Sequence, residues 1–129
     1  MKKVLLVLIL SFAFHFNFAN TNDPLLSQAK ELSSNKNYTE AIKTYKKYLS
    51  STKNNNLKNV YVEMANCYFK INDKVTAINY IKDAITSYGF SEQDFIYNEV
   101  IDSELSKEAL AAVYDDLDKL HNKYVASLN

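Results

Sequence analysis

The amino-acid sequence predicts an all-helical protein made of stacked helix hairpins. Three observations point to this fold class. The chain of 129 residues contains only one Gly and one Pro, its apolar residues recur at helical spacing, and a pattern of helix pairs repeats after 36 residues. A β sandwich would need Gly and Pro in its many turns, so the composition argues against one. Helix pairs that repeat at such a period indicate a helical solenoid.

Residues 1–19 differ from the rest of the chain and are predicted to be a secretory signal peptide. They begin with the basic MKK, continue with the apolar VLLVLIL and end on the small residue Ala19. This order of charge, apolar run and small residue is typical of an export signal. We therefore expect cleavage near Ala19 or Asn20 and a periplasmic or secreted protein.

An uncleaved membrane anchor is the alternative interpretation of the same segment. The apolar span 4–19 is shorter than the ~20 residues that cross a bilayer. It is also interrupted by Ser11, His15 and Asn17. We favour export with cleavage, so the membrane is expected to be a partner only if this segment stays uncleaved.

The first predicted repeat covers about residues 22–55 and contains two helices. In NDP, Asp23 is placed to be the N-cap and Pro24 the first residue of the first helix. The second helix lies in NKNYTEAIKTYKKYL, where Ala41 and Ile42 belong to the apolar face. The polar connection KNNNL then leads into the second repeat.

The second predicted repeat covers about residues 58–91, and its first helix lies in NVYVEMANCYFK. At 100° per residue, bulky apolar residues surround Ala65 over a broad arc, which predicts a helix packed between neighbours on two sides. A second helix follows at about 74–88. Its Ala77 is expected to face Ala65, because small side chains let two helix backbones approach closely.

Both helix pairs resemble the tetratricopeptide repeat. YVEMANCY, with Ala77 sixteen residues after Tyr61, is similar to the pattern W-x2-L-G-x2-Y followed by A-x3-F, and NYTEAIKTYKKYL is similar to the second helix of that repeat. The match covers about residues 22–91. It departs from the pattern in its period of 36 rather than 34 residues, in Tyr48 where a small residue is usual, and in the lack of a closing Pro. The resemblance implies a right-handed solenoid.

The resemblance also implies a concave groove that binds a protein or peptide. Eight positions carried over from the family would face this groove: Asn59, Val62, Asn66, Phe69 and Lys70 in the second repeat, and Leu26, Lys30 and Ser33 in the first. Asn can hydrogen-bond the backbone of a bound peptide, and Lys can pair with a carboxylate. A merely hydrated helix face is the alternative interpretation.

Residues 92–129 are predicted to be a helical cap that covers the open end of the repeats. Gly89 can close the preceding helix in a left-handed conformation. Ser91 then forms a capping box with Asp94, and Phe90 a hydrophobic staple with Phe95, at the start of a short helix.

One long amphipathic helix is expected to end the chain. Apolar residues step by three or four through this region, and the predicted helix begins at Ser103 or Ser106 and ends near Leu128. With the short helix before it, this long helix would form the capping pair.

Charge and cysteine content exclude some classes of function. The chain has 15 Lys, no Arg and 15 acidic residues; residues 20–90 hold 10 Lys and 6 acids, whereas residues 91–129 hold 3 Lys and 9 acids. Neither excess is strong enough to indicate a nucleic-acid partner. A single Cys in an exported chain excludes an internal disulfide framework.

The sequence contains no pattern typical of catalysis, a cofactor or a metal site. His121 has no second ligand at usable spacing, and Cys67, with no His or Cys nearby, is interpreted as a small buried residue. Asp115, Asp116 and Asp118 would point in different directions on one helix, which does not suit calcium. We therefore expect no enzyme, no cofactor and no metal.

Two hypotheses for function follow. The leading one is an exported scaffold that mediates protein–protein or protein–peptide interaction through the concave groove. The alternative is a structural subunit of an envelope complex that forms a homo-oligomer through the long C-terminal helix. An enzyme is the third hypothesis and has no supporting motif.

Overall fold

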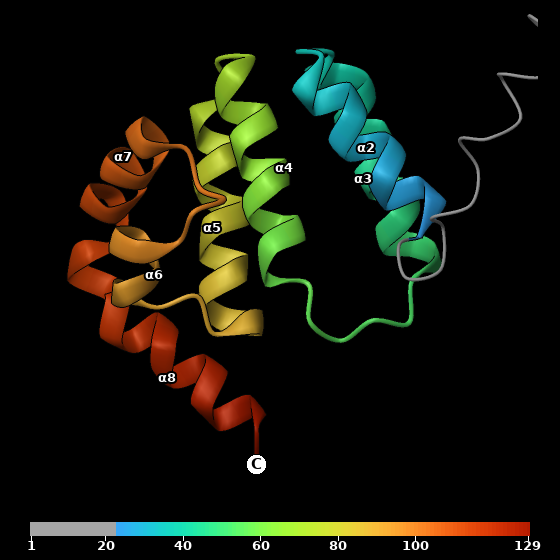
Figure 1. The fold of residues 1–129 in the computed structure, drawn as a ribbon. Helices are drawn as coiled ribbons and strands as arrows, with labels where there is room; N and C mark the ends of the chain where they lie inside the picture. The colour runs from blue at the N-terminus through green and yellow to red at the C-terminus, as the bar shows by residue number, and fades with distance from the viewer. Residues whose placement is uncertain (1–22) are drawn as a thin grey trace, which may run out of the picture.

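The structure, a computed structural model, describes residues 23–129, and this part of the chain contains helices and no strand. The helices run in the order α2 (Pro24–Ser34), α3 (Tyr38–Ser51), α4 (Lys58–Lys70), α5 (Lys74–Tyr88), α6 (Glu92–Tyr97), α7 (Ser103–Val113), the 3₁₀ turn η1 (Tyr114–Asp116) and α8 (Leu117–Ser127), as Figure 1 shows. The expected all-helical fold is confirmed. The predicted signal peptide and its cleavage site lie outside the described residues.

The helix pairs α2–α3 and α4–α5 are closed by the same turn, 36 residues apart. The backbone N–H of Asn37 donates to the carbonyl of Leu32 at 2.8 Å, and the N–H of Asp73 donates to the carbonyl of Tyr68 at 2.9 Å. Adding 36 to each residue number of the first bond gives the second bond. The self-similarity of the sequence is therefore also a similarity of the backbone at these turns.

Each of these turns contains one residue in the left-handed region. Lys36 has a φ of 61° and Asn72 a φ of 65°, and they occupy equivalent positions. Asn tolerates this conformation better than Lys does, because its short polar side chain can hydrogen-bond locally. The first hairpin thus has the less suitable residue at its turn.

Small residues lie where the helices of each pair meet. Ala65 and Ala77 are fully buried, and so are Ala29 and Ala41 at the corresponding positions of the first hairpin. The predicted contact points are confirmed as buried sites. Ala111 on α7, by contrast, is exposed.

Helix α4 is buried on two sides, as its broad apolar arc predicts. Val60, Met64 and Cys67 belong to the apolar cluster of the first hairpin. Val62 and Ala65 belong to a second cluster, which α5 shares with the C-terminal helices. Helix α4 therefore joins the two halves of the core.

The link between α5 and α6 has the local structure that its sequence predicts. Gly89 has a φ of 70°, and the N–H of Phe90 donates to the carbonyl of Ala84 at 3.0 Å. The N–H of Ser91 donates to the Asp94 carboxylate at 2.8 Å, as in a capping box. The rings of Phe90 and Phe95 pack edge to face with their centroids 4.8 Å apart, so the two residues form the predicted hydrophobic staple.

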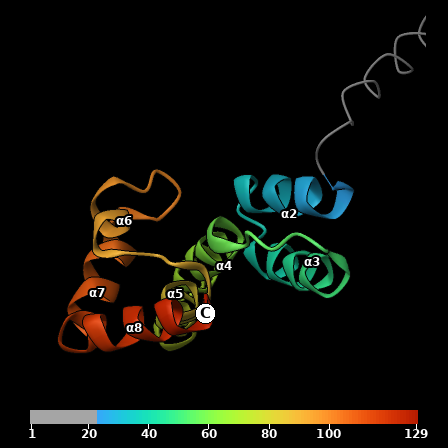
Figure 2. The same ribbon diagram turned by 90° about the horizontal axis from the view of Figure 1, so that it is seen from below.

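The prediction of a single long C-terminal helix is wrong. Helix α7 ends at Val113, the 3₁₀ turn η1 follows, and α8 begins at Leu117. Figures 1 and 2 show that the chain changes direction between α7 and α8. Both helices pack against α5, and the break at η1 allows this, because a straight helix would carry its second half away from the core.

The contact between α8 and α5 also explains a second role of Gly89. A Cβ atom at this position would lie 2.7 Å from the ring of Tyr124 on α8, closer than atoms can pack. Glycine at this position therefore permits both the left-handed turn and the close approach of α8. Among the described helices none has the length and apolar character needed to cross a membrane.

Candidate protein-interaction site

The polar stripe of α4, which we call the α4 polar face, consists of Asn59, Glu63, Asn66 and Lys70. Much of this face contacts residues 92–129 of the same chain, which we call the C-terminal unit. Figure 1 shows the connection between α6 and α7 reaching toward α4 before the chain returns to α7. The residues predicted to line the groove lie in three environments: some contact the C-terminal unit, some are packed in or near the core, and some remain accessible.

Asn66 holds two backbone groups of the α6–α7 connection. Its Nδ2 donates to the carbonyl of Val100 at 2.8 Å, and its Oδ1 accepts from the N–H of Asp102 at 2.8 Å. Both polar atoms of the amide are thus used on backbone groups two residues apart in the bent connection between α6 and α7. The chemistry expected for a bound peptide is present, but the bound segment is the protein's own.

Lys70 binds the same connection through its charge. Its Nζ lies 3.0 Å from the Asp102 carboxylate. This carboxylate also caps α7, because it accepts from the N–H groups of Glu104 and Leu105 at 2.9 and 3.1 Å. One aspartate therefore links the start of α7 to the end of α4.

Two more contacts extend this arrangement toward the start of α4. Asn98 Nδ2 donates to Asn59 Oδ1 at 3.4 Å, and Lys58 Nζ lies 3.3 Å from the Asp94 carboxylate. Asn59 is nevertheless exposed. The C-terminal segment thus covers the Asn66 end of the α4 polar face more closely than the Asn59 end.

The two apolar groove residues predicted on α4 are packed rather than free. Val62 is fully buried in the core, so it does not line an open surface. Phe69 is half-buried, with Lys74 Nζ 5.8 Å from its ring centroid. Lys74 is in turn paired with Glu108 of α7 at 2.9 Å. The C-terminal unit therefore also reaches this side of α4.

The predicted residues of the first hairpin remain more accessible. Lys30 is exposed and lies 3.8 Å from Glu63 of α4, a distance at which a surface pair contributes little. Leu26 is half-buried, and Ser33, also half-buried, accepts a hydrogen bond from the thiol of Cys67 at 3.6 Å. The open part of the predicted groove is therefore on α2 and at the start of α4.

Glu63 connects the two hairpins through a partly buried hydrogen bond. The hydroxyl of Tyr45 on α3 donates to the Glu63 carboxylate at 2.5 Å. Burial raises the pKa of Tyr45 far above its ordinary value, and the hydrogen bond to the Glu63 carboxylate raises it further. The hydroxyl therefore stays protonated and acts as a structural donor.

The carboxylates of the C-terminal unit that face α4 are stabilised in the charged form. Partial burial alone would raise the pKa of Asp102, but the N–H groups of α7 and the charge of Lys70 outweigh it, so the pKa lies below its ordinary value. The pKa of Asp94 is likewise low, because the Ser91 N–H and Lys58 overcome the effect of burial. Both ion pairs are therefore formed at neutral pH.

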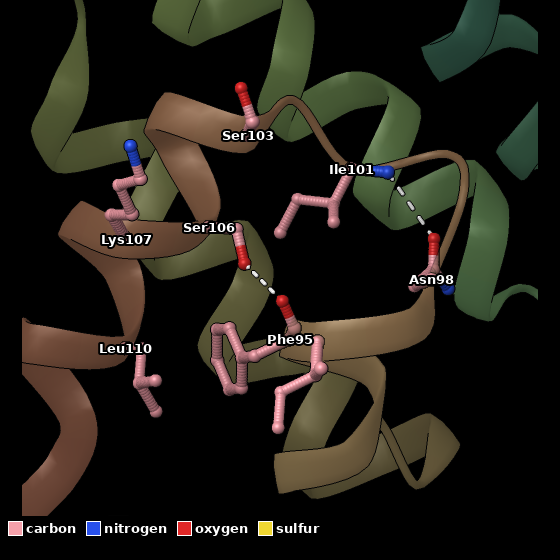
Figure 3. Close-up of a pocket in the computed structure, with 8 residues that line it drawn as sticks. Phe95, Asn98, Ile101, Ser103, Ser106, Lys107 and Leu110 are labelled. Carbon is pink, nitrogen blue, oxygen red and sulfur yellow. Dashed lines mark hydrogen bonds between the residues drawn. The ribbon is translucent and has the colours of Figure 1, made fainter.

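A pocket between α6 and α7, shown in Figure 3, was not expected from the sequence. It has a volume of about 290 Å³ and is lined by Phe95, Ile96, Asn98, Ile101, Ser103, Ser106, Lys107 and Leu110. Ile96, one of these lining residues, is 65% exposed, and Tyr97, the next residue in the chain, is 77% exposed. The run FIY in a helix of six residues was the available signal, because one helix face cannot bury three consecutive apolar residues.

The described residues hold no cluster of side chains suited to binding a metal ion. They contain no group of three or more His, Cys, Asp or Glu side chains that could ligate a metal ion. Cys67 is fully buried and burial raises its pKa, which makes it a poor nucleophile. His121 is exposed on α8, 6.2 Å from the ring of Tyr124.

Comparisons with protein families, with curated proteins and with solved structures find no match to this chain.

Proposed function

We propose that the protein is an exported helical-repeat scaffold, similar to tetratricopeptide repeat proteins, that binds a protein or peptide partner. In this proposal the two hairpins form the start of a right-handed solenoid, and residues 92–129 cap it. The observation that carries the proposal is the recurrence of one hairpin plan after 36 residues, with the same turn bonds and the same buried alanines. Stacked hairpins of this kind present extended surfaces for partners.

The proposed partner surface is the open part of the predicted groove. It comprises Leu26, Lys30 and Ser33 on α2, and Asn59 at the start of α4. In Figure 2, α2 and α6 lie on either side of α4 toward the top of the view.

Site-specific photo-crosslinking tests this surface. A photoreactive amino acid at position 30 or 59 is expected to form an adduct of one defined mass in envelope extracts. The matched control is position 47, because Lys47 is exposed on α3 and lies outside the predicted groove. The proposal fails if position 47 gives the same adducts as positions 30 and 59, or if neither groove position gives one.

Self-association through the C-terminal helices is the second candidate function. Its support is the exposed apolar end of α8, where Leu128 is 66% exposed and Val125 is also exposed. Light scattering across a range of concentrations tests it. A dimer mass that falls to the monomer mass in a variant with Val125→Ser and Leu128→Ser would favour this candidate, whereas a constant monomer mass would refute it.

A further inference from the structure

The α6–α7 connection binds α4 in the way a separate peptide would. Two side chains of α4 hold it. Asn66 hydrogen-bonds one backbone carbonyl and one backbone N–H of the connection, and Lys70 forms an ion pair with the carboxylate of Asp102. The connection has its own internal support: Asn98 Oδ1 accepts from the N–H of Val100 at 2.9 Å and of Ile101 at 3.2 Å. Figure 3 shows the Asn98–Ile101 bond.

We propose that the connection 98–102 is an intramolecular ligand of α4, which closes the Asn66–Lys70 end of the groove until a partner with a similar acidic segment displaces it. This inference rests on the proposed function, because it assumes that the groove serves a partner. It adds the chemistry of that partner and a means of control.

The packing of the C-terminal unit is compatible with release of this connection. Helices α7 and α8 pack against α5, the second helix of the α4–α5 hairpin. Contacts between the connection and the α4 polar face come from side chains. Release of the connection would also take Ile101 out of the core cluster, whereas the contacts of α7 and α8 with α5 come from other residues.

Ile101 explains why the connection stays bound when no competitor is present. Its side chain is buried in the core cluster shared by α4, α5 and α7. In addition, a ligand tethered within the same chain has a high effective concentration, in the millimolar range for short flexible links. A free peptide must overcome both advantages.

The displaced contacts define the partner that would fit. It is a segment that can adopt the same bend, with a free carbonyl at one position and, two residues later, an N–H on a residue with a carboxylate side chain. An apolar residue lies between them, as Ile101 lies between Val100 and Asp102. The own-chain sequence YNEVIDS, residues 97–103, meets these requirements and supplies a defined probe.

Fluorescence anisotropy with a labelled YNEVIDS peptide tests the inference on the purified protein. The variant Asp102→Ser weakens the internal ligand, because Ser keeps the N-cap of α7 but loses the charge that Lys70 binds. We expect Asp102→Ser to bind the peptide at least about tenfold more tightly than the original protein does, since more of its groove is free. Adding Asn66→Ala to this variant should abolish the binding.

Glu99→Ser is the matched control for charge, because Glu99 is an exposed acid in the same connection. It should bind the peptide no better than the original protein does. Hydrogen exchange gives a readout that needs no peptide: the amide of residue 102, which Asn66 protects, should exchange faster in Asp102→Ser while the amides of α5 stay protected.

Three results would overturn the inference. They are equal peptide binding by Asp102→Ser and the original protein, binding that survives Asn66→Ala, and an equal gain in Glu99→Ser. None of these would affect the crosslinks expected from positions 30 and 59, so failure of this inference is distinguishable from failure of the proposed function.

Discussion

The two hairpins share one plan but differ in what covers their first helices. In α2–α3 and α4–α5 the turns have the same hydrogen bonds and the helix contacts have alanines at equivalent positions. The face of α2 around Lys30 is open to solvent, whereas the equivalent face of α4 around Asn66 is bound to the chain's own C-terminal unit. The place of a hairpin in the array therefore decides whether its polar face is free for a partner.

The residue types fit this difference. Lys30 and Asn66 occupy the same position, 36 residues apart. Lysine carries a flexible, strongly hydrated charge that suits an exposed surface. Asparagine has both a donor and acceptor on one short side chain, so it can satisfy a backbone N–H and a carbonyl together.

Ala77→Leu tests whether the buried alanines set the distance between helices. Ala77 is fully buried between α4 and α5, so the larger side chain should lower the free energy of unfolding by about 1–3 kcal/mol. Ala41→Leu should have a similar effect in the first hairpin. Ala111→Leu, at an exposed position, is the control and should change little. Urea unfolding measures all three, and equal midpoints for Ala77→Leu and Ala111→Leu would contradict the helix contact.

Asn66→Ala tests the contrast between the covered and the open face. It leaves the Val100 carbonyl and the Asp102 N–H without their partner, which should cost about 1–2 kcal/mol of unfolding free energy. Lys30→Ala, the equivalent change on the open face, should stay within about 0.5 kcal/mol. Thermal and urea unfolding compare the two, and similar losses would show that the faces do not differ.

Acid should weaken the contact between α4 and the C-terminal unit. The folded pKa of Asp102 is below its ordinary value, so its contribution is present above an unfolded pKa of about 3.9 and is lost as pH falls through the folded pKa. The stability gap between the original protein and Asp102→Asn should therefore shrink between about pH 6 and pH 2. Urea unfolding across this range measures it, and a constant gap would contradict the ion pair.

The pKa shift of Asp83 is opposite in sign to that of Asp102, so Asp83 serves as an internal check. Burial raises its pKa, so its charged form is disfavoured in the folded protein and its stabilising contribution is lost as pH rises through the folded pKa. Asp83→Asn should therefore gain stability relative to the original protein as pH rises, in the same urea unfolding series. The two variants together separate the effects of the individual groups from general acid unfolding.

Lys36→Gly should give the smallest effect, and it should stabilise the protein. Lys36 has a φ of 61°, which glycine adopts without the steric cost that a Cβ atom imposes. We expect a gain of about 0.5–1 kcal/mol. Asn72→Gly, at the equivalent turn, should gain less because Asn already tolerates this region. Differential scanning calorimetry measures the melting temperatures, and a lower melting temperature for Lys36→Gly than for the original protein would contradict the turn geometry.

Local features of the fold were predictable because their causes lie within a few residues. The N-cap at Asp23, the left-handed Gly89 and the staple between Phe90 and Phe95 each depend on neighbours in the sequence. The buried alanines were predictable from helical periodicity. The break at η1 was not, because Leu117 and Tyr124 continue the apolar spacing of α7, and only the position of α5 determines that α8 turns back toward it.

The candidate site shows the same division. The sequence predicted that Asn66 would bind the backbone and Lys70 a carboxylate of a partner, whereas in the structure they bind backbone groups and a carboxylate of the same chain. It did not show that the backbone and the carboxylate belong to residues 98–102. Those residues are distant along the chain, since Val100 lies 34 positions after Asn66, and no local pattern encodes the pairing.

The sequence alone therefore determined helices α2 to α6 and the faces they bury, since hydrogen bonding and side-chain spacing along one helix are local properties. Only the tertiary structure decided which polar face stays open. That outcome depends on how α7 and α8 pack on α5, and so on where their connection is carried relative to α4.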